Sequence, residues 1–229
     1  ILMAFGGSTM TLPDRMKCNL EDPNSIKAWQ FIQDMIWKDY SMVSPLVNQE
    51  QRGDYRFINE QVAMMQGSHE QVLEINQKNP SLRYDMAPLP KGPAGNGTIL
   101  QFHIWVIYNR SKNKEAAWHL VKWLATEGSI AGAPNKPAAL MGLIPAYKDY
   151  ARGPAFAEGA NEPDHIVEAQ LIPSTWRLAT YPSCFNYKTD QIAGQDGFGP
   201  ALEQILMNKK TAAEALKGIS KKIDALMEQ

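Results

Sequence analysis

Apolar positions at helical spacing mark the first long element of this chain. Ile26, Trp29 and Ile32 recur every three or four residues, which is the period of an amphipathic helix. Just before them, Asp22 can cap a helix and the proline that follows suits its first turn. The pattern therefore predicts a helix over about residues 23–38.

Three apolar segments downstream predict β-strands. Residues 61–66 resemble a short buried strand, residues 84–90 a strand that runs into prolines, and residues 100–108 a strand rich in β-branched and aromatic side chains. A loop rich in glycine and proline, residues 91–97, separates the second strand from the third. The chain is therefore expected to change direction before residue 100.

Helical patterns lie between and after these strands. They predict helices at residues 55–59, from residue 69, and at residues 113–124, 201–208 and 211–227. The last helix opens with a capping box, because Thr211 can cap the backbone while Glu214 reaches back. Residues 128–142 predict short helical turns, and residues 174–198 show little periodicity. The alternation of strands and helices indicates an α/β fold.

Composition narrows the classes of function. The 229 residues are 44% hydrophobic, so the chain has enough apolar surface for a packed core. The 23 Lys and Arg residues nearly balance the 24 Asp and Glu residues, and neither sign forms blocks, so nucleic acid is not an expected partner. No apolar run is long enough to span a bilayer, so the chain is not expected to be embedded in a membrane.

The first residues of the sequence and its two cysteines bear on how the protein is processed and where it is located. It starts at Ile1 without an initiator methionine or the basic region of a signal peptide, so we expect it to be a piece of a longer chain. Cys18 and Cys184 lie far apart in sequence. Two free thiols are the simpler interpretation, and one disulfide in an oxidising compartment is the alternative.

The sequence predicts neither a metal nor a cofactor. The four histidines form no zinc-binding motif, and the Gly92–Gly97 loop lacks the Lys-Ser/Thr ending of a phosphate loop. His69 and His103 fall at or near strand ends beside turns, where contact with a ligand and ordinary packing are about equally expected. Ser68 is not part of a nucleophile elbow, so a hydrolase is only weakly supported.

Six short motifs occur in a characteristic order. They are Asp-Pro-Asn-Ser at 22–25, Arg-Phe-Ile-Asn-Glu-Gln-Val-Ala-Met at 56–64 leading to Gly-Ser at 67–68, Ala-Pro-Leu-Pro-Lys-Gly-Pro at 87–93, Ser-Lys-Asn-Lys-Glu-Ala-Ala-Trp at 111–118, Gly-Leu-Ile-Pro at 142–145 and Thr-Ala-Ala-Glu-Ala-Leu at 211–216. In this order and spacing the chain resembles the carboxy-terminal half of an extracellular solute-binding protein of family 1, the maltose-binding-protein-like sugar receptors of ABC importers.

The resemblance implies a type II periplasmic-binding-protein-like α/β fold, mostly the C-terminal lobe with a partial N-terminal lobe. Residues 1–103 and 149–229 would form the C-terminal lobe, and residues 104–148 the returning part of the N-terminal lobe. Residues 99–104 and the region after Pro145 would cross between the lobes. Because the first strands of the N-terminal lobe would precede Ile1, residues 104–148 are expected to leave an apolar face unpaired. Self-association or a missing partner segment would follow.

The resemblance also implies function: binding of a sugar or a related polar solute in a cleft between the lobes, and delivery to the membrane permease of an ABC importer. The resemblance implies that the protein is not an enzyme. It also implies a periplasmic or extracellular location, where the protein could be a cell-surface lipoprotein. Carried over by position, the turn Gly67-Ser68-His69 matches a Gly-Ser-Trp turn whose aromatic ring stacks on sugar in many relatives. The site residues implied are Ser68, His69, Gln101, His103, Arg177, Tyr181, Gln195 and Asp196.

His69 in place of tryptophan and His103 in place of a small residue indicate a smaller and more polar cleft, suited to a polyol or a glycerol phosphate. Two other functions stay open. A carbohydrate-active enzyme would need two carboxylates facing each other across a cleft, and Asp196 is among the carboxylates available. A non-transport interaction protein could use the same fold.

Overall fold

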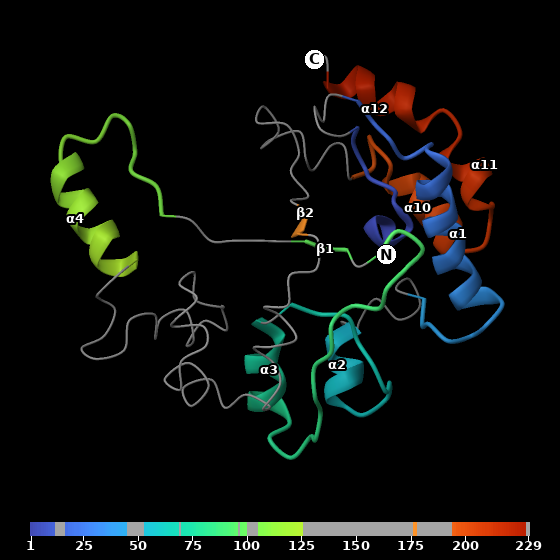
Figure 1. Cartoon of the computed structure of the whole chain (residues 1–229), viewed down its shortest axis with the longest axis horizontal. Coiled ribbons are helices and arrows are strands. Elements are labelled where there is room, and N and C mark those ends of the chain that lie inside the picture. The colour runs from blue at the N-terminus through green and yellow to red at the C-terminus, as the bar shows by residue number, and fades with distance from the viewer. Residues whose placement is uncertain are drawn as a thin grey trace. The chain divides into compact units, whose positions relative to one another are not determined.

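The computed structural model describes residues 1–11, 17–44, 53–68, 70–95, 97–99, 105–125, 176–177 and 194–227 (Figure 1). The chain divides into two compact units. Unit 1 comprises Ile1–Glu50, Leu89–Leu100 and Ser174–Gln229, and unit 2 comprises Gln51–Pro88 and Gln101–Pro173. The helical turns expected at residues 128–142 lie outside the described residues.

The first long helix of unit 1 forms where the sequence predicts it. Helix α1 spans Pro23–Trp37 and follows a one-turn 3-10 helix, η1, at Leu2–Phe5. The Asp22 side chain accepts a hydrogen bond from the backbone N–H of Asn24 at 2.9 Å, and Pro23 occupies the first turn. One otherwise unpaired N–H of the helix start is thereby satisfied, which confirms the predicted cap.

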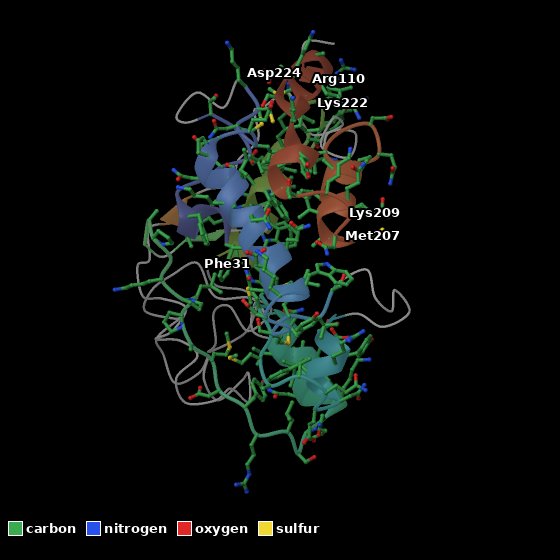
Figure 2. All side chains as sticks on the ribbon, turned by 90° about the vertical axis from the view of Figure 1, so that its right-hand side faces the viewer. Phe31, Arg110, Met207, Lys209, Lys222 and Asp224 are labelled. Carbon is green, nitrogen blue, oxygen red and sulfur yellow. The ribbon has the colours of Figure 1, made fainter. Side chains whose placement is uncertain are left out.

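The core of unit 1 is formed by residues near the two ends of the chain, which pack against each other. Helices α10 (Gly199–Leu206), α11 (Ala212–Leu216) and α12 (Ile219–Met227) supply most of its buried side chains. Leu20, Ile205, Leu216 and Ile223 are fully buried there, and α1 runs alongside α10 and α11 (Figures 1 and 2). Each such side chain stabilises the fold by about 1.5–3 kcal/mol through the removal of apolar surface from water.

The C-terminal end of unit 1 differs from the sequence prediction. The expected single helix over 211–227 is two helices, α11 and α12. Its capping box is confirmed, because Thr211 Oγ1 accepts from the Glu214 backbone N–H and the Glu214 carboxylate accepts from the Thr211 backbone N–H. The break falls at Gly218, whose φ of +80° is a left-handed conformation that glycine adopts without a steric penalty.

Cys18 is one of the buried residues of this core. Its backbone N–H donates to Asp224 Oδ1 on α12 at 2.7 Å, and Figure 2 labels Asp224. The Cys18 thiol is free, and burial raises its pKa. Cys184 lies outside the described residues, but a free Cys18 contradicts the alternative of a disulfide between the two cysteines.

In unit 2, helices α2 (Gly53–Ile58) and α3 (Glu70–Lys78) are held by local contacts. The Asn79 side-chain amide donates to the Ile58 carbonyl at 2.9 Å, and the Phe57 and Tyr84 rings meet edge to face at 6.0 Å. Helix α4 (Lys114–Ala125) follows a stretch without regular structure over 105–113. These three helices confirm the helical segments expected near residues 55–59, 69 and 113–124.

The predicted strands are largely wrong. Residues 61–66 and 84–90 form no strand, and Met64, expected to be buried, is 86% exposed. Of residues 100–108, the described part, 105–108, is not in a strand either. An apolar run becomes a strand only where another strand pairs with its backbone, and within the described part of the chain these segments have no such pairing. Among the described residues, no helix is both long enough and apolar enough to cross a membrane.

Candidate functional site

A two-stranded parallel sheet joins two distant parts of the sequence in unit 1. Strand β1 (Thr98–Ile99) pairs with β2 (Trp176–Arg177), with Thr98 opposite Trp176 and Ile99 opposite Arg177. This pairing places the backbone of Arg177, a predicted site residue, beside the start of the predicted crossing over 99–104. Residues 174–198 show little periodicity, so their sequence predicts no strand, because two residues are too few to show a period.

The loop before β1 is fixed against the N-terminal 3-10 helix. Gly92 and Gly95 exchange backbone hydrogen bonds of 3.0 Å, and the Ala94 N–H donates to the Ala4 carbonyl at 2.8 Å. A side chain at Gly92 would collide with the Ala4 backbone, and one at Gly97 with Met3. Glycine at these positions allows close backbone packing, so the glycine-rich loop has a structural role in setting where β1 begins.

Gln195 and Asp196 lie on an exposed turn at the start of α10. The turn is closed by the Gly197 N–H, which donates to the Gly194 carbonyl at 3.1 Å. Lys222 Nζ on α12 donates to the Gly197 carbonyl at 3.3 Å, which ties the turn to α12. Both predicted side chains are therefore open to solvent on an anchored turn, a geometry that a ligand can reach. An acidic group just before a helix also complements the positive end of the helix dipole.

Ser68 has a structural role at the start of α3 in unit 2. Its backbone N–H donates to the Gln71 side-chain oxygen at 2.8 Å, and the Gln71 N–H donates to the Ser68 carbonyl at 3.1 Å. This is one half of the reciprocal arrangement of a capping box. The Ser68 residue is exposed, so its hydroxyl remains accessible while its backbone starts the helix.

The remaining predicted site residues lie outside the described part of the chain. They are His69, Gln101, His103 and Tyr181. The structure thus places Arg177, Gln195 and Asp196 in unit 1 and Ser68 in unit 2. Among the described residues, no group of three His, Cys, Asp or Glu side chains is arranged to hold a metal ion.

Sequence reasoning also missed two exposed aromatic residues that follow the crossing. Trp105 and Tyr108 were assigned to the interior of a strand, yet both are more than half exposed. The signal was present in the sequence as four consecutive apolar residues, 105–108. Such a run does not reveal whether a partner covers it.

A family model connects this chain with known proteins. The model described as bacterial extracellular solute-binding protein matches residues 3–163. A binding protein of Brucella abortus strain 2308 is 26% identical over 213 residues, which are 92% of this chain and 48% of the relative. A protein of Brucella suis biovar 1 matches to the same extent. The chain therefore spans about half the length of the curated relatives it matches.

Solved structures show the fold. The ABC substrate-binding protein Lmo0181 of Listeria monocytogenes, in complex with cycloalternan, superposes with a TM-score of 0.71 at 18% identity over 99% of this chain and 55% of that chain. Maltose-bound MalE3 of T. maritima gives 0.70 at 21% identity, over 98% and 55%. A solute-binding protein of Thermotoga lettingae bound with α-D-tagatose gives 0.64 at 23% identity, over 99% and 54%. The architecture is the α/β fold of periplasmic-binding-protein-like receptors, represented here by part of its length.

Proposed function

We propose, since this chain belongs to the bacterial extracellular solute-binding protein family, that it is the solute-binding part of an ABC importer that takes up a sugar or a related polar solute. The match to the family model over residues 3–163 carries this proposal. Its narrowing to sugars is supported by three relatives of the same fold that were solved with cycloalternan, maltose and α-D-tagatose.

The proposed solute site consists of the residues that the resemblance implies. Ser68, Arg177, Gln195 and Asp196 come from described turns and strands, and the members outside the described residues are His69, Gln101, His103 and Tyr181. Hydroxyl-rich solutes need planar or charged hydrogen-bonding groups and an aromatic face for the apolar side of a ring. Imidazole, guanidinium, amide and phenol groups meet both needs, and Arg177 would favour a polyol or sugar phosphate.

Transport would follow from binding without chemistry. The solute would bridge the two lobes that the resemblance implies and stabilise a closed arrangement relative to an open one. The membrane permease would recognise the closed arrangement and accept the solute. In this role the protein would act in the periplasm or, as a lipoprotein, at the outer surface of the cell.

A ligand screen tests the proposal directly. Thermal unfolding would be followed with neutral sugars, polyols, sugar phosphates and glycerol phosphates, since a ligand that binds only the native state raises the melting temperature. A shift with one solute class supports a receptor, and the absence of any shift contradicts one.

Single substitutions connect the screen with the proposed residues. His69→Ala, His103→Ala and Arg177→Ala should each weaken the binding of the solute found, by about tenfold for one lost hydrogen bond to a charged group. His119→Ala, on an exposed part of α4, is the matched control and should bind normally. Unchanged titration curves for all three variants would exclude these residues from the site.

A further inference from the structure

The turn Gly67-Ser68 is held by one side chain of the helix that follows it. The Ser68 backbone N–H donates to Gln71 Oε1 at 2.8 Å, and the Gln71 N–H donates to the Ser68 carbonyl at 3.1 Å. In a complete capping box the serine hydroxyl would accept the second bond. Here the carbonyl accepts it, so the two bonds fix the backbone of Ser68 and involve its hydroxyl in neither.

Glycine at position 67 leaves room for this contact. A Cβ at Gly67 would collide with Gln71 Oε1, the same atom that accepts the Ser68 N–H, and would lie 2.9 Å from Met65 Cε. The φ of Gly67 is not in the left-handed region, so a larger residue would be accommodated if these flexible side-chain ends moved away. Movement of the Gln71 oxygen would break its bond to Ser68. Gly67 and Gln71 are therefore expected to act as a coupled pair.

Helix α3 gives Gln71 a fixed base. Val72 and Ile75 on this helix are each only 4% exposed, as is Ile58 of α2, and the two helices pack against each other (Figure 1). Asn79 adds the hydrogen bond to the Ile58 carbonyl at the far end of α3. Because Gln71 precedes a buried residue, the backbone that carries its side chain is held in place. A polar side chain on a packed helix can hold a neighbouring turn in one conformation.

We propose that Gln71 is a positioning residue for the solute site. With Gly67 it sets the backbone conformation from which Ser68 and the next residue, His69, contact the solute. This inference rests on the proposed function, which takes Ser68 and His69 as solute contacts, and Gln71 acts through Ser68. A turn that is already ordered before the solute arrives loses less conformational entropy on binding. The contact between Gln71 and Ser68 thus increases the affinity for the solute.

Substitutions of Gln71 separate its acceptor oxygen from its contribution to the helix. Gln71→Ala removes the acceptor and keeps a good helix former, whereas Gln71→Glu keeps an oxygen at the same distance from the backbone. Gln77→Ala, at an exposed position of the same helix, is the matched control. Hydrogen exchange of the Ser68 amide, followed by NMR, should be about fivefold faster in Gln71→Ala, as expected for one lost hydrogen bond. The other two variants should exchange like wild type.

Solute binding is the second measurement. Isothermal titration would use four probes, namely maltose, sorbitol, a glucose phosphate and a glycerol phosphate, at a temperature where every variant is folded. Gln71→Ala should bind the probe that wild type binds at least about fivefold more weakly. Gln71→Glu should restore the affinity for an uncharged probe. A role confined to the stability of α3 would lower the melting temperature and leave the affinity unchanged.

A double-variant cycle tests the coupling with Gly67 for any probe, charged or not. Gly67→Ala should weaken binding about as much as Gln71→Ala, because it displaces the same oxygen. In the Gln71→Ala background, Gly67→Ala should change the affinity less than about twofold. Losses that simply add overturn the proposal, since they would show that the two residues act independently.

The remaining outcomes distinguish this inference from the proposed function. A probe that binds wild type and Gln71→Ala equally well overturns the inference alone. Unchanged exchange of the Ser68 amide in Gln71→Ala also overturns it. If wild type binds none of the four probes, the proposed function fails and the inference fails with it.

Discussion

The Glu21 carboxylate caps the start of the last helix by accepting the Ser220 backbone N–H at 2.9 Å. Its other oxygen accepts the Gly218 N–H at 2.8 Å. Residues almost two hundred positions apart are thus joined at the point where α11 ends and α12 begins. The contact satisfies two N–H groups that a helix start leaves unpaired, and it ties the N-terminal segment of unit 1 to its C-terminal helices.

Glu21→Gln should destabilise unit 1, because the amide offers one acceptor and turns a donor toward the second N–H. We expect a loss of about 1 kcal/mol in the free energy of unfolding, the usual cost of a lost helix cap. Chemical denaturation monitored by circular dichroism measures it. Asp39→Asn, on an exposed residue of unit 1, is the control. A loss as large in the control would assign the effect to charge alone.

The same contact predicts a dependence of stability on pH. Partial burial on its own raises the pKa of Glu21, but the N–H donors of Gly218 and Ser220 outweigh it and hold the pKa below its usual 4.5. A carboxyl whose pKa is lower in the folded state contributes its stability above the pKa of the unfolded state. That contribution should be lost as the pH falls from about 4.5 through the folded pKa. Denaturation curves of wild type and Glu21→Gln should therefore converge in acid, and a constant difference would contradict the account.

The buried Gln33 side chain should be intolerant of apolar replacement. Its amide nitrogen lies 3.0 Å from the Ile205 carbonyl, 2.8 Å from the Lys210 carbonyl and 3.1 Å from Asn208 Oδ1. Gln33→Leu removes this donor from a place where water is excluded, and only the Ile205 carbonyl is shown to keep a backbone partner, the Asn208 N–H. The expected cost is about 1–3 kcal/mol in unfolding free energy. Gln77→Leu, at an exposed position of α3, is the control and should be nearly neutral. A neutral Gln33→Leu would show that water replaces the amide.

Adding a side chain at Gly218 tests the cost of its backbone conformation without a steric collision. A Cβ at this position would meet open space, so only the left-handed φ of +80° opposes it. Gly218→Ala should cost about 1–2 kcal/mol in folding free energy. Gly218→Asn should cost less, because asparagine tolerates this conformation. Equal melting temperatures for the two variants would indicate that the turn between α11 and α12 adjusts its backbone.

His69 predicts how solute preference can be changed. His69→Trp restores the aromatic residue that the resemblance places at this turn and should strengthen binding of neutral sugars by about tenfold, roughly the value of one stacking contact. Binding of anionic solutes should not improve. Isothermal titration with one sugar and one sugar phosphate measures the ratio. An unchanged ratio would place residue 69 away from the solute.

The proposed receptor role also predicts binding without turnover. Chromogenic glycosides of any sugar that binds should release no nitrophenol above background, because glycoside hydrolysis requires two suitably placed carboxyl groups. The assay should include Asp196→Asn beside wild type. Release by wild type that disappears in this variant would support the enzyme alternative instead.

Local signals were reliable where the deciding contacts are close in sequence. The Asp22 cap, the first-turn proline, and the capping box of Thr211 and Glu214 were all predictable, because each forms within four residues. Strands were not predictable in the same way. Thr98 pairs with Trp176, a residue 78 positions further along the chain. The apolar run at 61–66 has no strand partner among the described residues.

The candidate site shows the same division. The sequence and its resemblance named the residues, and the structure gave positions to Ser68, Arg177, Gln195 and Asp196. The structure also shows that the Ser68 N–H donates to the Gln71 side chain at the start of α3. The Ser-x-x-Gln spacing is the sequence signal for this contact.

By itself, the sequence determined the family, the main helices and their caps, since these depend on residue order and on contacts within a turn or two. Only the tertiary structure decided that the C-terminal helix breaks at Gly218, where Glu21 supplies the acceptors. It also decided which apolar residues are buried. Ile205 on α10 lies in a core because distant helices cover it, whereas Trp118 on α4 is exposed. Whether an apolar side chain is buried depends on the elements that pack against it, and its hydrophobicity alone does not determine this.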